Sequence, residues 1–487
     1  MSASSSSDAG AALERAQPFW RGPGKALGAL LLAALLARLP FLLWGGLHFD
    51  SDQAVMGLMA RHISQGRAFP IYFYGQSYLL PVLSYLAAPV VALAGLKVWA
   101  VKAPLLAMTV FLLAAAHTIL RRQGGLGPWR AALALSPLAL CNPVTLSRLV
   151  EAQGGNLESL FWVVLFWLLR GRPVWLGAVA GVAAQNREIA LCGLASLLAV
   201  KALDRDLSAR YLIRMAAPFA LIWTAIKLAG PLGANYCPYN APVGLAPLDI
   251  MWRNAGAAAR LLAALHGLAG QRLGDYNIAS ALDFGGAPAA ACYAALGALA
   301  LFSAQDFVKP AARFPLYLGV AAALCVGAFV GLFKGRPDLM SARYFLLTQL
   351  GVVAVAAVLL QGRLRKPAAV ALAALALWHG AQSAALWREQ ITHPQPWPHM
   401  DLARAIEKAG FVGVRCSHGD GYALGFLMNE RIPCFVTDYP RIQEWQREFA
   451  RREGVVAIIV AKDASGPPGQ VVHGWRVVPI RKKAGQR

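Results

Sequence analysis

The stretch Ala26 to Leu47, ALGALLLAALLARLPFLLWGGL, is followed directly by His48-Phe49-Asp50-Ser51-Asp52. A transmembrane helix needs about 17–25 predominantly apolar residues, and this stretch has that length. Two carboxylates therefore stand where the chain leaves the predicted bilayer. Acidic groups in such a place bind a metal, hold a cation or take a proton in a reaction. The junction predicts a membrane protein with a polar site at one membrane face.

The composition indicates many spans. Of the 487 residues, 57% are hydrophobic and only 14% are charged, and the mean hydropathy is +0.49. A soluble domain has about 25% charged residues. The formal charge of +22 reflects, in a polytopic protein, Lys and Arg retained on the cytoplasmic side. We therefore expect the lipid bilayer as a partner, and no nucleic acid.

Apolar stretches predict spans over 26–47, 98–120, 130–147, 156–170, 215–232, 286–303, 314–333, 343–361 and 367–387. The stretch 174–200 is interrupted by Gln185-Asn186-Arg187-Glu188, a polar block too costly for a bilayer centre. We predict two short helices there that meet at a surface. The total is about eleven spans, which makes the fold an all-α polytopic membrane protein.

Basic residues set the orientation. With these spans, one side collects Arg15, Arg21, Lys25, Arg121, Arg122, Arg130, Arg170, Arg172, Lys201, Arg205, Arg210, Arg214, Lys309, Arg313, Arg363, Arg365 and Lys366. The positive-inside rule makes that side the cytoplasm. The segment Tyr78 to Leu96 is apolar enough to span, but it is broken by Pro81 and Pro89. Counting it as a span would put Arg121 and Arg122 outside, so we place it as a juxtamembrane helix at the outer face.

The end of the chain has a different character. From about Gln395, helices predicted at 399–409, 422–429 and 441–452 alternate with β-runs at 412–416, 432–437 and 455–460. This alternation predicts a small parallel-sheet α/β domain. We read Gly419-Asp420-Gly421 as a turn, because no phosphate-loop spacing completes it. Cys416 and Cys434 are either free thiols or a disulfide.

Three domains follow from these patterns. Residues 1–24 form a disordered cytoplasmic segment, residues 25–390 a transmembrane domain, and residues 391–487 an extracytoplasmic domain. The outer side then holds the acidic loop 48–97, residues 148–158, the block 185–188, the loop 233–285, residues 334–343 and the C-terminus.

The first outer loop carries a longer motif. It reads HFDSDQAVMGLMARHI from His48 to Ile63 and continues with Gly66, Phe69-Pro70 and Tyr74-Gly75-Gln76. Arg343-Tyr344 precedes a late span, and Ser417 to Phe426 reads SHGDGYALGF. Over nearly the whole chain, this pattern resembles the polyprenyl-phosphate-sugar-dependent glycosyltransferases of the C fold (GT-C). Their superfamily includes protein O-mannosyltransferases and bacterial lipid A aminoarabinose transferases.

The resemblance implies transfer of a sugar from a polyprenyl-phosphate carrier to an acceptor of the cell envelope. It also implies a multi-pass protein of the bacterial inner membrane, acting at the outer face. Many relatives have Asp-Glu where this chain has Asp52-Gln53. Either Asp50 or Asp52 is therefore the essential carboxylate.

Sugar transfer needs a base for the acceptor and positive charge for the departing phosphate. Asp52 is the first candidate for the base, with Asp50 as its partner. The pair could also bind a divalent cation such as Mg²⁺ or Mn²⁺, the only cofactor we consider. In the alternative interpretation, both aspartates merely cap a helix that begins near Gln53, because Asp is a favoured N-cap residue.

Substrate-binding candidates are Tyr74, Gln76, Glu151, Arg187, Arg343 and Tyr344. Arg343 is the first choice for the phosphate, because a guanidinium offers a planar fork of donors. Arg187 could instead pair with Glu188, and Glu158 could simply start a helix. Lys334 and Arg336 are typical of lipid headgroup contacts, and His62 of packing.

Two functions from other classes remain open. A lipid-linked-glycan flippase or secondary transporter would also be basic and polytopic, but it should show inverted repeats and charges at mid-membrane. A non-enzymatic envelope assembly protein could use the C-terminal domain as a binding module. Such a protein should tolerate loss of both aspartates.

Overall fold

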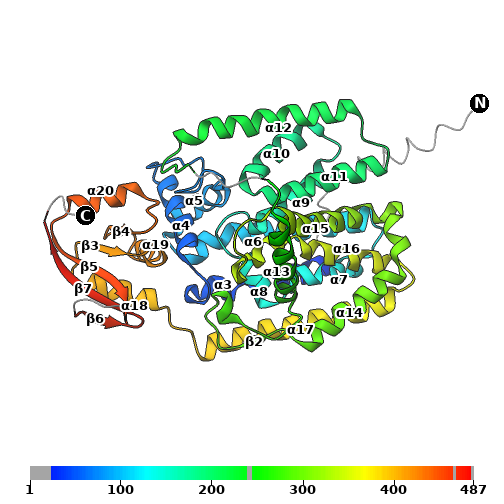
Figure 1. The fold of residues 1–487 in the computed structure, drawn as a ribbon. Coiled ribbons are helices and arrows are strands. Elements are labelled where there is room, and N and C mark those ends of the chain that lie inside the picture. Colours follow the sequence, from blue (N-terminus) through cyan, green and yellow to red (C-terminus); the bar gives the residue numbers. More distant parts are fainter. Residues whose placement is uncertain (1–23, 239–243, 464–467, 484–487) are drawn as a thin grey trace, which may run out of the picture.

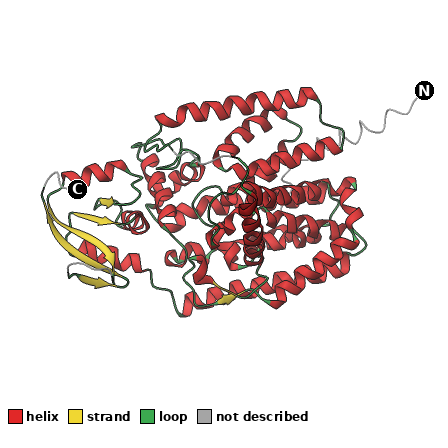
Figure 2. Ribbon diagram, in the orientation of Figure 1, coloured by secondary structure: helices red, strands yellow, loops and turns green. Residues whose placement is uncertain are grey.

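A computed structural model describes residues 24–238, 244–463 and 468–483. Most of it is helical, and one sheet lies at the C-terminal end (Figures 1 and 2). The predicted disordered segment 1–24 falls almost wholly outside the described residues. The helices before the C-terminal part are α2 (Lys25–Arg38), α3 (Pro40–Leu43), α4 (Ser51–Ser64), α5 (Val82–Ala94), α6 (Val98–Arg122), α7 (Pro128–Ala139), α8 (Pro143–Leu149), α9 (Asn156–Leu169), α10 (Pro173–Asn186), α11 (Leu191–Leu203), α12 (Ala209–Ala229), α13 (Leu248–His266), α14 (Ala287–Phe302), α15 (Arg313–Leu332), α16 (Thr348–Gln361) and α17 (Arg365–Thr392).

Long apolar helices make this a multi-pass membrane protein. Among the described residues, four helical segments are long and apolar enough to cross a membrane, namely Val98–Arg122, Ala209–Leu232, Pro310–Leu332 and Arg365–Thr392. A fifth span results if Leu339–Phe345 and α16, bent by 47°, are counted together. The other predicted spans are shorter helices; the first, 26–47, is divided into α2, α3 and a 3₁₀ turn. The count of about eleven stays a prediction.

The segment predicted to lie beside the membrane forms α5. Its 13 residues correspond to about 20 Å of helix, short of the ~30 Å hydrocarbon core. It packs on α4, where the Ser84 hydroxyl donates to the Met56 carbonyl at 3.1 Å. Helices of similar length, α9 with 14 residues and α11 with 13, stand at predicted spans, so the juxtamembrane placement of α5 stays a prediction.

The polar block 185–188 breaks a helix, as predicted. Helix α10 ends at Asn186 and α11 begins at Leu191, with a 3₁₀ turn at Glu188–Ala190 between them. Gln185 and Asn186 are buried in protein, and that the two helices meet at a membrane surface stays a prediction. The Asn186 side chain donates to the Leu80 carbonyl at 3.1 Å and accepts from Trp162 Nε1 at 2.9 Å.

Helix α12 stands at the edge of the bundle and packs on α10 (Figure 1). Met215 is its only buried residue. The two backbones approach closely at Gly177, where a Cβ atom would lie 2.0 Å from the Met215 carbonyl oxygen. Because most of the other residues of α12 are exposed and most of them are apolar, its outer face suits lipid.

Several of the predicted basic clusters do gather at one end of the bundle. The C-terminal ends of α9 and α11 and the N-terminal end of α15 border a cavity of about 990 Å³. Arg170, Arg172, Lys201 and Arg313 line it. That this end faces the cytoplasm stays a prediction.

The C-terminal part is an α/β unit. It contains α18 (Pro398–Lys408), β3 (Gly413–Cys416), α19 (His418–Leu427), β4 (Cys434–Val436), α20 (Gln443–Arg451), β5 (Gly454–Ala461), β6 (Gln470–Val472) and β7 (Trp475–Lys482). The strand order is β4-β3-β5-β7-β6. Strand β3 is parallel to β4 and β5, whereas β7 is antiparallel to β5 and β6. The three predicted strands are therefore parallel, as expected, whereas the β6–β7 hairpin, which adds the antiparallel pairs, was not predicted.

Two smaller expectations about this unit are settled. Gly419-Asp420-Gly421 is not a turn but lies in the first turns of α19. Cys416 and Cys434 are both buried free thiols. They lie on neighbouring strands, but Val414 stands opposite Cys434 and Val436 opposite Cys416.

Helix α4 joins the two parts of the molecule, since α19 packs against it (Figure 1). The Ser51 hydroxyl donates to the His418 carbonyl oxygen, and Arg61 donates to the Asn429 carbonyl at 3.0 Å. At Gly57 a Cβ atom would come 2.5 Å from the Phe426 ring, so glycine permits the close approach. The helix that follows the acidic motif is thus held by the C-terminal unit.

Candidate functional site

Asp50 starts α4 as its N-cap. Its backbone is extended, and Oδ1 accepts a hydrogen bond from the Gln53 amide at 3.0 Å. Asp50 therefore caps the helix, and whether it also has a catalytic role stays a prediction. The Gln53 side chain accepts from the Ala152 amide at 3.1 Å, which ties the first polar loop to the second. Behind the motif, buried Lys102 donates to the His48 carbonyl at 2.6 Å.

Asp52, in the first turn of α4, lies where both parts of the molecule meet. Its Oδ1 is 2.8 Å from Arg441 Nη2 and 3.5 Å from His418 Nε2, both from the C-terminal unit. Its Oδ2 accepts from the Gln153 side chain, and the Gln153 oxygen in turn accepts from Arg343. The Asp52 side chain is 25% exposed, so solvent reaches the cluster.

The surroundings of the two aspartates shift their pKa values in opposite directions. Burial, with the negative charges of Glu151 and Asp52 nearby, raises the pKa of Asp50 to about 6. Burial acts in the same direction on Asp52, but hydrogen bonds and charge from His418, Arg441 and Gln153 outweigh it. They hold the pKa of Asp52 below its ordinary value. Asp50 is thus the more basic carboxylate.

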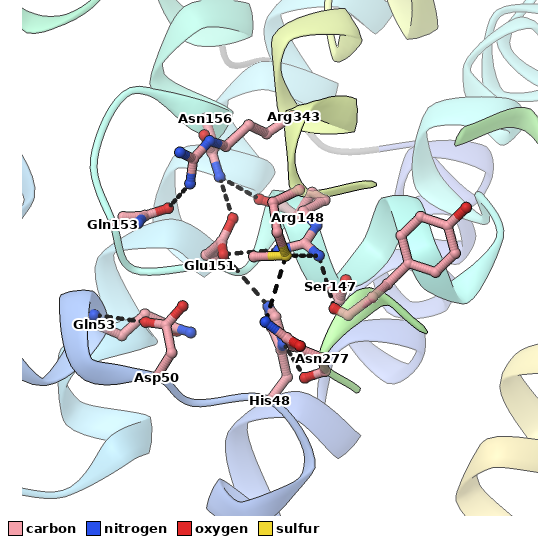
Figure 3. A network of polar contacts seen from close by, with 12 residues as sticks. His48, Asp50, Gln53, Ser147, Arg148, Glu151, Gln153, Asn156, Asn277 and Arg343 are labelled. Atoms are coloured by element: carbon pink, nitrogen blue, oxygen red, sulfur yellow. Dashed lines mark hydrogen bonds and ion pairs between the residues drawn. The ribbon is translucent and has the colours of Figure 1, made fainter. Parts of the chain in front are cut away.

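Glu151 belongs to a second, fully buried cluster (Figure 3). Its oxygens accept from Arg148 at 2.9 Å and from Asn156 at 2.7 Å. Burial would raise the pKa of Glu151, but Arg148, His48 and Arg343 hold it below its ordinary value. Burial and the adjacent Arg148 lower the pKa of His48 to about 3, so its imidazole is neutral at pH 7. Glu151, predicted as a substrate-binding residue, is therefore a buried carboxylate held by Arg148 and Asn156.

Arg187, Arg343 and Tyr344 lie together. The guanidinium carbons of Arg187 and Arg343 are 5.2 and 5.6 Å from the Tyr344 ring centroid. The Arg187 stem packs on Gly155, where a Cβ atom would lie 2.6 Å from Arg187 Cδ. In the part of the chain that the structure describes, no ion pair joins Arg187 to Glu188. The structure thus brings two of the predicted cations to one aromatic ring.

Other predicted residues lie elsewhere. Tyr74 is buried where α4 meets the C-terminal unit, and its hydroxyl forms a hydrogen bond with His62 Nδ1 at 3.0 Å. His62 Nε2 lies 2.8 Å from Glu430 Oε1. His62 therefore packs as expected. Gln76 is partly buried, and Glu158 is buried in the first turn of α9. Lys334 is partly buried and Arg336 exposed.

The acidic residues do not form a metal site with protein ligands alone. Within the described ranges, no three His, Cys, Asp or Glu side chains converge to hold an ion. Asp52 is already paired with Arg441, and Glu151 with Arg148.

Sequence reasoning missed several members of these clusters. Gln153 and Arg148 lie beside the predicted Glu151, and His48 opens the quoted motif, so proximity could have indicated them. His418 lies within the quoted segment 417–426. Arg441 carries no local signal, since it is one of many arginines in a polar stretch of the C-terminal unit.

Comparison with solved structures places this geometry in a known fold. The structure of ArnT from Cupriavidus metallidurans in the apo state aligns at a TM-score of 0.55 and 13% identity, covering 90% of this chain and 93% of that one. ArnT from the same organism bound to undecaprenyl phosphate aligns at a TM-score of 0.57 and 14% identity, covering 94% and 99%. The chain has the fold of ArnT.

The fold that the resemblance to GT-C proteins implies is thereby confirmed as the fold of ArnT. No protein-family model and no curated protein sequence matches the chain. The alignment with the undecaprenyl phosphate-bound structure covers 94% of this chain.

Proposed function

We propose that this chain is a membrane glycosyltransferase that moves a sugar from a polyprenyl-phosphate donor to an acceptor of the cell envelope. One observation carries the proposal. In the ArnT fold, the neighbouring carboxylates Asp50 and Asp52 have opposite pKa shifts. Asp52 pairs with the guanidinium group of Arg441 and is linked to that of Arg343 through Gln153. A solved ArnT structure with this fold holds undecaprenyl phosphate, which supports a polyprenyl-phosphate donor here.

Asp50 is the proposed general base. A carboxylate with a pKa of about 6 is ionised at neutral pH and is a better proton acceptor than Asp52. It would take the proton of the acceptor hydroxyl or amine as that group attacks the anomeric carbon. The bond from this carbon to the phosphate oxygen breaks in the same step, so direct displacement inverts the configuration. The assignment differs from the first choice made from sequence, which was Asp52.

The departing phosphate carries negative charge that must be stabilised. Arg343, linked to Asp52 through Gln153, and Arg187 on the same Tyr344 ring are the proposed phosphate ligands. Guanidinium groups suit this task because they present several donors in a plane. Asp52 then serves to hold Arg441 and Gln153 in place.

The proposed location is the outer face of a bacterial inner membrane, with about eleven spans and an extracytoplasmic C-terminal unit. A lipid-linked donor suits this face, because its phosphate can enter from the bilayer between helices. The grouping of Arg170, Arg172, Lys201 and Arg313 at the far end of the bundle supports the orientation.

The test is release of polyprenyl phosphate. The purified protein is incubated with a panel of polyprenyl-phosphate sugars and an envelope extract, and the released lipid phosphate is measured. We expect release with at least one donor, and loss of release in Asp50→Asn. A transporter or an assembly protein would release none. Equal release by wild type and by both Asp50→Asn and Asp52→Asn would refute the catalytic assignment.

A further inference from the structure

Arg441, between β4 and α20, reaches from the C-terminal unit into the Asp52 cluster. Its side chain is only 7% exposed, and its guanidinium carbon lies 5.0 Å from the Phe73 ring centroid and 5.1 Å from that of Tyr439. The stem packs on Gly75, where a Cβ atom would lie 2.7 Å from Arg441 Cγ. Gly75 has φ +74°, so a side chain there would also be strained. Arg441 is therefore rigidly placed.

The guanidinium has donors that the described residues leave unused. Nη2 pairs with Asp52, but Nε and Nη1 are buried and meet no hydrogen-bond acceptor within the described ranges. Buried polar groups are normally hydrogen-bonded, and leaving a charged donor unpaired is costly. Arg441 Nε and Nη1 are such unpaired donors, and they lie beside a site that solvent reaches. We therefore expect a ligand to supply their hydrogen-bond acceptor.

The surrounding charges indicate the kind of acceptor. Asp52 is engaged by Arg441 and Gln153, and Glu151 is buried against Arg148. Neither carboxylate is left to compensate an ammonium group of a ligand. Asp50 forms no ion pair among the described residues, but in the proposed mechanism it takes the proton of the attacking acceptor group. An ammonium group of a ligand would instead meet the guanidinium groups of Arg343 and Arg441. The cluster thus favours oxygen acceptors and disfavours cations.

We infer that Arg441 binds oxygen atoms of the donor's sugar, and that this sugar is neutral or acidic and bears no free ammonium group. The inference rests on the proposed function and deepens it by naming a substrate class. Hydroxyl and carboxylate oxygens share the required chemistry, since both accept hydrogen bonds from a guanidinium. Arg441 is a binding residue in this scheme, and the C-terminal unit supplies part of the sugar site.

The test measures binding rather than turnover. Farnesyl phosphate linked to glucose, to glucuronic acid or to an aminopentose serves as donor probe, and farnesyl phosphate without sugar is the reference. For wild type we expect the glucose or glucuronate probe, or both, to bind at least about tenfold more tightly than the aminopentose probe. Arg441→Lys keeps the charge but loses the planar fork, so it should weaken binding of the preferred probe about tenfold or more. Binding of farnesyl phosphate should stay within about twofold.

Arg447→Gln, on the exposed side of α20, is the matched control and should bind like wild type. Thermal unfolding of each variant shows whether the C-terminal unit has remained folded. If Arg441→Lys unfolds, the inference is tested instead by probe binding to Arg441→Gln and by the preference of the wild-type protein among the probes. Tight binding of the aminopentose probe, or equal losses for sugar-linked and free farnesyl phosphate, would overturn the inference.

Failure of the inference and failure of the proposed function give different results. Turnover of an aminopentose donor would leave the glycosyltransferase proposal intact and refute the sugar class. Selective binding of the neutral or acidic probe without release of lipid phosphate from any donor would support the sugar class and refute the glycosyltransferase proposal. If no probe binds, the inference is wrong, whatever the turnover assay gives.

Discussion

Two polar clusters built from similar residues differ in their access to solvent. The closed cluster comprises His48, Arg148, Glu151 and Asn156, and all its side chains are buried. The open cluster comprises Asp52, Gln153, Arg343, His418 and Arg441, and here Asp52 is 25% and His418 22% exposed. A buried charge pair that solvent cannot reach holds the fold together. A partly buried pair that solvent reaches, with unused donors beside it, is available to a ligand.

The largest expected effect is in the closed cluster. Arg148→Ala leaves Glu151 buried without its cation, which costs about 3–5 kcal/mol in the free energy of unfolding. We expect loss of folded protein, or a strongly lowered Tm, in detergent. The double variant Arg148→Met with Glu151→Met removes both charges and should recover much of this loss. Wild-type stability of Arg148→Ala would contradict a structural role for the closed cluster.

Asp50→Asn should reduce transfer by about 10²–10⁴-fold, the usual contribution of a general base. Stability should hardly change, because Asn is also a favoured N-cap residue and can still accept from the Gln53 amide. The readout is kcat for lipid phosphate release together with Tm. If Asp50→Asn is nearly as active as wild type and Asp52→Asn is inactive, the base is Asp52.

Arg343 tests the phosphate side of the open cluster. Arg343→Ala should slow the chemical step by about 10²–10³-fold, and Arg343→Lys less, because lysine keeps the charge but lacks the fork. Single-turnover rates at saturating donor measure the step. Full turnover combined with weaker membrane association in Arg343→Ala would make Arg343 a headgroup anchor and shift the phosphate site to Arg187.

The smallest expected effect is a shift in pH dependence. Since Asp50 must be ionised to act as base, kcat/KM should fall as the pH drops through about 6. The charge of Asp52 contributes to the raised pKa of Asp50, so Asp52→Asn should lower that pKa. The pH at which kcat/KM falls should then move to a lower value. The shift should be no more than about one pH unit, measured on the residual turnover. A shift toward higher pH would mean that Asp52 does not act on Asp50 through its charge.

Local sequence signals were sufficient for several elements. The apolar stretch followed by Asp50 and Asp52 marked the start of α4, and the polar block 185–188 marked the break between α10 and α11. The alternation of β-runs and helices indicated the C-terminal α/β unit. Its β6–β7 hairpin was missed because WRVVPIRK is rich in charge and contains proline, which disguises a strand.

The open cluster could be predicted only in part, because its members are distant in sequence. Arg441 reaches Asp52 only through the packing of α19 on α4. The choice between the two aspartates as base depends on that same contact. Arg441 and His418 lower the pKa of Asp52, whereas the burial and negative neighbours of Asp50 raise its pKa. Neither environment can be read from the motif itself.

The contact between Asp52 and Arg441 also has a consequence for biosynthesis. The ribosome delivers Arg441 389 residues after Asp52. While the intervening helices are entering the bilayer, Asp52 has neither Arg441 nor His418 beside it. A nascent chain can therefore reach the membrane with its acidic motif in place and still lack a finished site, so assembly of the site waits for synthesis of the C-terminal unit.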